Sequence, residues 1–70
     1  MTNTMITKAI KAVKEARENC SFAYEAGFRH SGCNYRMWKD TDNGVWKVFR
    51  CSETDIHDTL VGEIPEGEIK

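Results

Sequence analysis

The chain has 70 residues, of which 40% are apolar and 30% charged, and its formal net charge is −1. This length allows one domain with a small core, and the composition is typical of a globular protein rather than a disordered one. No run of residues approaches the ~20 apolar residues that a membrane helix needs, and no signal-peptide pattern is present. We therefore expect a cytoplasmic protein with no membrane partner.

The charges are divided unevenly along the chain. Residues 1–39 carry seven basic and three acidic side chains, whereas residues 40–70 carry three basic and eight acidic ones. If the two halves are separate in the fold, the molecule is dipolar and its field steers a charged partner. Ordinary solvation of a small surface explains the same pattern equally well.

Residues 4–27 have the pattern of one amphipathic helix. Thr4 or Thr7 can cap its start, and Gly27 is placed to end it. Phe22 falls on the polar face, which indicates either that the helix bends or ends earlier, or that Phe22 contacts something outside this domain's core. The apolar stripe, at 100° per residue, consists of Ile6, Ala9, Ile10, Val13, Ala16, Cys20 and Tyr24.

After a connection at residues 28–34, two β-rich runs are joined through Asn43-Gly44, which predicts a hairpin with a type I′ turn. A two-residue loop places Trp38 opposite Phe49 and pairs an aspartate with a lysine across the strands. A three-residue loop would oppose like charges. Because cross-strand pairs contribute ~0.2–1 kcal/mol each, the two-residue loop is favoured.

Residues 53–61 fit two structures. Ser52-Glu-Thr-Asp55 resembles a helix capping box, but the β-branched residues that follow alternate as in a strand. A third strand is favoured because a two-stranded sheet is marginal on its own. The predicted fold is therefore α+β, with one N-terminal helix on a small antiparallel sheet in the order α-β-β-β. It is compact over residues 1–62, and residues 63–70 form an acidic tail.

Both faces of the predicted hairpin carry large apolar side chains, and one helix can cover only one face of a sheet. The second face needs the tail, a second copy of the chain or another macromolecule to cover it. If the tail folds back, both faces are internal. The residues that we predict to bind a partner are of types enriched at interfaces: Tyr35, Met37, Trp46 and Arg50, with Lys39 at the rim and Phe22 beside them.

Cysteine and histidine residues offer two further hypotheses. His30, Cys33, Cys51 and His57 are the donor types of a structural zinc site, although their spacing includes no C-x2-C pair. Cys33 with His30, or Cys51 with His57, could form a Cys–His nucleophilic pair, but nothing supplies the oxyanion pocket that catalysis needs. Three cysteines are an odd number, which favours buried thiols in a reducing compartment. We therefore predict neither a cofactor nor an enzyme.

Nucleic acid is the alternative partner. Tyr35 and Trp46 would stack on bases while Lys39 and Arg50 neutralise phosphates, and Lys8, Lys11 and Lys14 form a second basic strip. The net charge of −1 lacks the basic excess of a dedicated nucleic-acid binder. A protein partner is therefore favoured, and a homodimer is a further alternative.

The organisation of one short helix followed by a hairpin such as Asp42-Asn-Gly-Val-Trp-Lys-Val-Phe49 resembles that of small phage-encoded accessory proteins of the anti-CRISPR type. The resemblance lies in organisation and not in specific positions, so it assigns no functional residue. It implies a non-catalytic inhibitor or adaptor that acts stoichiometrically. Such a protein occupies a surface of a larger host complex, often one that handles nucleic acid.

Overall fold

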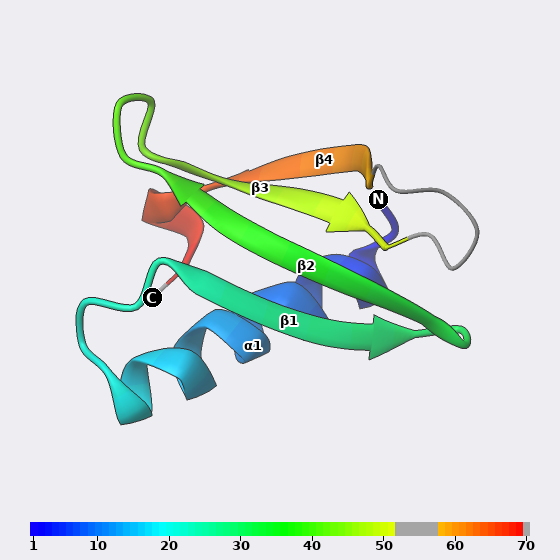
Figure 1. The fold of residues 1–70 in the computed structure, drawn as a ribbon, viewed down its shortest axis with the longest axis horizontal. Helices are drawn as coiled ribbons and strands as arrows, with labels where there is room; N and C mark the ends of the chain where they lie inside the picture. Colours follow the sequence, from blue (N-terminus) through cyan, green and yellow to red (C-terminus); the bar gives the residue numbers. More distant parts are fainter. Residues whose placement is uncertain (52–57, 70) are drawn as a thin grey trace.

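The computed structural model describes residues 1–51 and 58–69, and it has one helix packed on a four-stranded antiparallel sheet (Figure 1). The strands follow one another in space in the order β1-β2-β3-β4. The predicted α+β class is confirmed, with one strand more than expected. The elements are α1 (Asn3–Asn19), β1 (Glu25–His30), β2 (Cys33–Asp40), β3 (Val45–Arg50), β4 (Thr59–Pro65) and the 3₁₀ helix η1 (Glu66–Glu68).

Helix α1 begins at a side-chain cap and is held by an apolar stripe. The Thr2 hydroxyl accepts a hydrogen bond from the Met5 N–H at 3.2 Å, which satisfies one of the free donors of the first turn. Ala9 and Val13 are fully buried. Ile6 and Ile10 pack against the same core, as the predicted stripe requires.

The helix ends eight residues earlier than its predicted end at residue 27. Cys20 has an extended backbone, with φ −149°, and the Ala23 N–H donates to the Cys20 carbonyl to form a turn. Phe22 lies in this turn, 87% exposed, so its misfit on a longer helix marked a true boundary. Gly27 is not a helix cap but the middle of β1, which the helical pattern had concealed.

The first hairpin of the sheet joins β1 to β2, and its turn lies within residues 28–34, which were predicted to be a connection. His30 pairs with Cys33 across the two-residue turn Ser31-Gly32, and both turn residues have positive φ, at 50° and 78°. Positive φ at both central positions is the geometry of a type I′ turn, which suits the twist of a hairpin.

The second hairpin, β2–β3, has a four-residue turn at residues 41–44 rather than the predicted two-residue turn. Asp40 pairs with Val45. The Asp40 carboxylate accepts hydrogen bonds from the backbone N–H of Asp42 and Asn43 and from the Asn43 side chain, while Gly44 takes φ +66°. These local bonds outweigh the pairing that favoured the shorter loop. Because the register moves by two residues, every side chain keeps its predicted face.

The chain after residue 62 is part of the domain, and the predicted tail is wrong over residues 63–69. Glu63 to Pro65 complete β4, which contains a bulge opposite Val48 and Phe49. Ile64 and Ile69 are 1% and 5% exposed and belong to the core. The alternative of helix or strand at residues 53–61 is resolved only from Thr59 onward, where β4 begins; residues 52–57 lie outside the described part of the chain.

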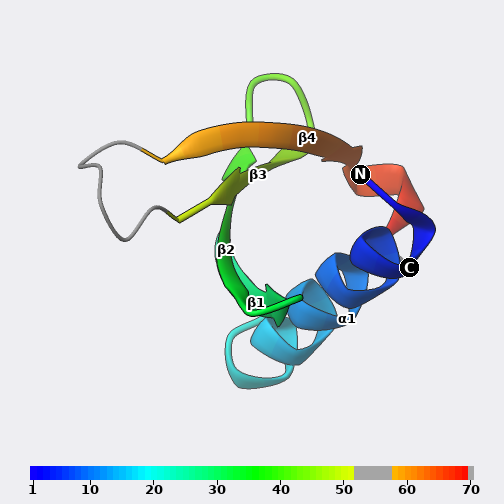
Figure 2. The same ribbon diagram turned by 90° about the vertical axis from the view of Figure 1, so that its right-hand side faces the viewer.

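The sheet curves around the core, and α1 lies across its concave side beside β1 (Figure 2). The 3₁₀ helix η1 lies at the other end of this side, next to β4. One sheet face, called the inner face below, therefore looks onto α1 and the core. The opposite face is called the outer face.

Candidate functional site

The residues predicted to form the binding surface lie mainly on the inner face, so this part of the prediction is wrong. Met37 and Trp46 are 0% exposed. Tyr35 is half-buried and stacks on Phe28 of β1, with ring centroids 5.0 Å apart and planes 7° apart. Alternation along β2 and β3 separates two apolar faces but does not say which of them the helix covers.

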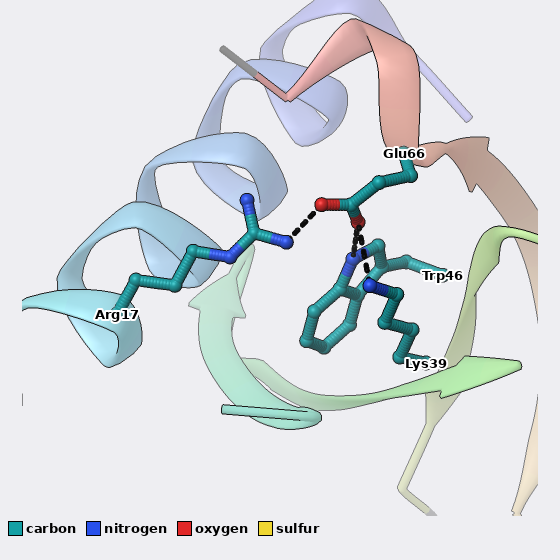
Figure 3. A network of polar contacts seen from close by, with 4 residues as sticks. All are labelled: Arg17, Lys39, Trp46 and Glu66. Carbon is teal, nitrogen blue, oxygen red and sulfur yellow. Dashed lines mark hydrogen bonds and ion pairs between the residues drawn. The ribbon is translucent and has the colours of Figure 1, made fainter. Parts of the chain in front are cut away.

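Lys39 also belongs to the inner face, in a polar network that closes one end of the core (Figure 3). The Glu66 carboxylate accepts hydrogen bonds from the Arg17 guanidinium and, at 2.5 Å, from the Trp46 indole N–H. Lys39 Nζ lies 3.8 Å from Glu66 Oε2, and the Arg17 guanidinium lies 5.9 Å from the centroid of the Trp46 ring. The network thus binds α1, β2, β3 and η1 together.

The electrostatics of Glu66 show how the network works. Burial by itself raises the pKa of a carboxyl group, but the hydrogen bonds from Arg17 and Trp46, with the charges of Arg17 and Lys39, outweigh it. The pKa of Glu66 therefore lies below its ordinary value. Glu66 is held as a carboxylate because the charged form has its partners, which is the role of a structural ion pair.

The two remaining predicted contacts, Arg50 and Phe22, are exposed rather than buried. Arg50 lies at the end of β3 and pairs with Tyr35 of β2 in the sheet register. Phe22 lies in the turn after α1, beside Tyr24, which is 64% exposed. The structure therefore does not bring the six predicted residues together on one surface.

The outer face is the sheet surface that no described element covers (Figure 2). Trp38 and Phe49 meet on it edge to face, with ring centroids 5.1 Å apart, and the Trp38 indole N–H donates to Glu25 at 3.2 Å. Leu60, opposite Phe49, is 50% exposed. By strand alternation, the outer face consists of Glu25, Gly27, Arg29, Asn34, Arg36, Trp38, Asp40, Val45, Lys47, Phe49, Leu60, Glu63 and Pro65.

A shallow hollow of about 370 Å³ lies beside Trp38 on the outer face. Glu25 and Arg36 line it together with Trp38, and its floor is open because Gly27 has no side chain. Sequence reasoning placed Trp38 and Phe49 on one face without choosing it as a site. The signal was present, since the same alternation puts Arg36 and Lys47 next to these rings.

Charges on the outer face are balanced, with three basic and three acidic side chains among its residues. Lys47 Nζ lies 3.5 Å from Asp40 Oδ2. The Asn43 side chain, then the backbone N–H groups of Asn43 and Asp42 and the charge of Lys47, lower the pKa of Asp40, while desolvation acts against them. The face therefore offers apolar rings within a mixed, neutral rim.

The donor set proposed for zinc is only partly placed. His30 and Cys33 are partners across the first turn, and Cys51 continues the β2–β3 ladder through a hydrogen bond to the Asn34 carbonyl at 2.9 Å. His57 lies outside the described residues, and residues 1–51 and 58–69 contain no group of three potential metal ligands. The hypothesis of a His30–Cys33 nucleophilic pair likewise gains no oxyanion donor from this geometry.

Comparisons with protein-family models, with curated proteins and with solved structures give no match. Within the described ranges, α1 is the longest helix, and it is neither long nor apolar enough to cross a bilayer. The function must therefore be argued from the surface itself.

Proposed function

We propose that this protein is a non-catalytic binding module that docks its outer face on a larger protein, as a stoichiometric inhibitor or adaptor. The observation that carries the proposal is the pair Trp38 and Phe49 on a sheet face that no described element covers, next to the half-exposed Leu60. Exposed clusters of aromatic and aliphatic side chains with arginine at the rim are typical of protein interfaces.

Charge favours a protein over nucleic acid as the partner. Arg36 and Lys47 flank the rings, but Glu25, Asp40 and Glu63 share the same face, so the surface has no basic excess to attract phosphates. A protein surface with its own mixed charges is complementary to such a rim. The predicted biological setting, a complex that handles nucleic acid, concerns the partner and not this surface.

Affinity capture from a lysate of the source cells, treated with nuclease, tests the proposal with two matched variants. Leu60→Glu places a charge on the outer face, and Phe22→Glu makes the same change at an exposed apolar residue elsewhere. We expect one protein to be retained in stoichiometric amount by the wild type and by Phe22→Glu, and to be lost from Leu60→Glu.

Three results would contradict the proposal. Equal capture by both variants would place the contact elsewhere. Loss of capture on nuclease treatment would favour the nucleic-acid alternative. A concentration-dependent dimer of the pure protein that Leu60→Glu abolishes would show that a second copy covers the outer face.

A further inference from the structure

Strand β1 forms an edge of the sheet, because β2 is its only partner strand among the described residues; α1 packs beside β1. His30 and Cys33 close the two-residue turn, and the Lys39 N–H donates to the Tyr24 carbonyl at 2.9 Å. Hydrogen-bonded pairs alternate along an antiparallel ladder. The N–H and C=O groups of the intervening residues Glu25, Gly27 and Arg29 therefore point away from β2, toward this edge.

The two sheet edges differ in their protection. Strand β4 contains a bulge, ends at Pro65, which has no N–H, and has the Met1 side chain packed against Gly62. Bulges and proline are devices that keep other strands from pairing with an edge. Strand β1 has neither of these. Its central residue, Gly27, is exposed and has no side chain to hold another backbone away.

The edge of β1 is bordered by a basic groove. A hollow of about 220 Å³ lies between α1 and β1, with Lys8 and Lys11 on the helix side and Gly27, Phe28 and Arg29 along the strand. Glu15 is its single acidic residue, and Glu15 Oε1 lies 4.0 Å from Lys11 Nζ. The groove thus keeps an excess of positive charge directly beside free backbone donors and acceptors.

We propose that the edge of β1 takes up an extended acidic segment of a partner protein as a fifth strand. Main-chain hydrogen bonds to Gly27 and Arg29 would hold the segment, and Lys8 and Lys11 would select for its carboxylates. A second copy of β1 is a poor occupant because two basic grooves would meet. This inference rests on the proposed binding function but assigns a surface separate from Leu60.

Amide chemical shifts of the ¹⁵N-labelled protein, titrated with a capped octapeptide of alternating glutamate and valine, test this proposal. We expect saturable shifts that are largest at the amides of β1. Reversing both groove lysines (Lys8→Glu with Lys11→Glu) should weaken binding about tenfold or more. The single reversals Lys8→Glu and Lys14→Glu form a matched pair, because Lys14 is an exposed lysine of α1 outside the groove; Lys14→Glu should have a much smaller effect.

A second peptide set separates strand addition from simple charge attraction. Methylating the backbone nitrogens on one edge of the peptide should abolish binding, while methylation on the other edge should leave it intact. Equal binding of a lysine–valine peptide, shifts at Trp38 and Leu60 in place of β1, or no saturable shift would each overturn the proposal. Concentration-dependent shifts of β1 without peptide would show that a second copy occupies the edge. Leu60→Glu should leave the titration unchanged, so this test is independent of the contact proposed at Leu60.

Discussion

Each of the two tryptophans of this protein donates an indole N–H hydrogen bond to a glutamate, but one ring is buried and the other lies at the surface. On the inner face, the Trp46 indole N–H donates to Glu66, and the ring is fully buried. On the outer face, the Trp38 indole N–H donates to Glu25 at an exposed site. The pair teaches that residue type and hydrogen bonding do not separate a core tryptophan from a surface one. What distinguishes them is whether another element of the fold packs over the ring.

Replacing each tryptophan by alanine should lower the unfolding free energy by very different amounts. Trp46→Ala removes the largest buried side chain and should cost about 3–5 kcal/mol of unfolding free energy, which is most of the stability of a domain of this size. Trp38→Ala should cost about 1 kcal/mol, because its ring is only partly buried. Guanidinium unfolding followed by circular dichroism measures both. Equal losses would mean that the outer face is also enclosed.

Glu66→Gln should have the next largest effect, about 1–3 kcal/mol, because Arg17 loses its charged partner next to the core. Since the pKa of Glu66 is lowered in the folded state, its contribution is present above the ordinary value of 4.5 and is lost as the pH falls through the folded value. Melting temperatures should therefore decrease less steeply in acid for Glu66→Gln than for the wild type.

Glu68 provides the control for this experiment, since it is an exposed glutamate of the same 3₁₀ helix. Glu68→Gln should reproduce the acid dependence of the wild type. If Glu66→Gln did so as well, the carboxylate of Glu66 would contribute nothing to the pH dependence of stability.

Leu60→Glu should change stability least, within about 0.5 kcal/mol, because half of the side chain is already in water. The same substitution should abolish partner capture. Differential scanning calorimetry on the variant used for capture checks this directly. A large loss of stability would show that Leu60 supports the fold, and Trp38→Phe would then be the variant for testing the outer face.

Local pattern was sufficient for several parts of the fold. The stripe with Ala9 and Val13, the presence of a hairpin at Gly44, though not its turn length, and the division of side chains between two sheet faces are as predicted. The faces are correct despite the wrong register because a shift of two residues preserves the side on which each residue lies. These features depend on neighbours in the sequence, so the sequence could predict them.

Features that depend on distant residues could not be predicted in this way. The helical pattern of apolar residues continues in the sequence beyond Asn19, where α1 ends, so it predicted helix where β1 begins. Residues 25–30 form a strand because they pair with β2, which the local pattern does not show. The choice of covered face depends on where α1 lies. Glu66 resembles any other acidic residue near the end of the chain until the fold brings Arg17 and Trp46 to it.

The contact between Arg17 and Glu66 spans 49 positions of the sequence, whereas each of the first two hairpins joins strands separated by a short turn. The hairpins can therefore form early from local segments, and the long closure follows once its slower search is complete. A growing or truncated chain that stops before residue 66 would contain most of the sheet. It would lack Ile69 and the Glu66 carboxylate that binds Arg17 and Trp46. Such a fragment would leave the Trp46 indole N–H without its Glu66 partner, and during synthesis it would be more open to aggregation or proteolysis than the complete domain.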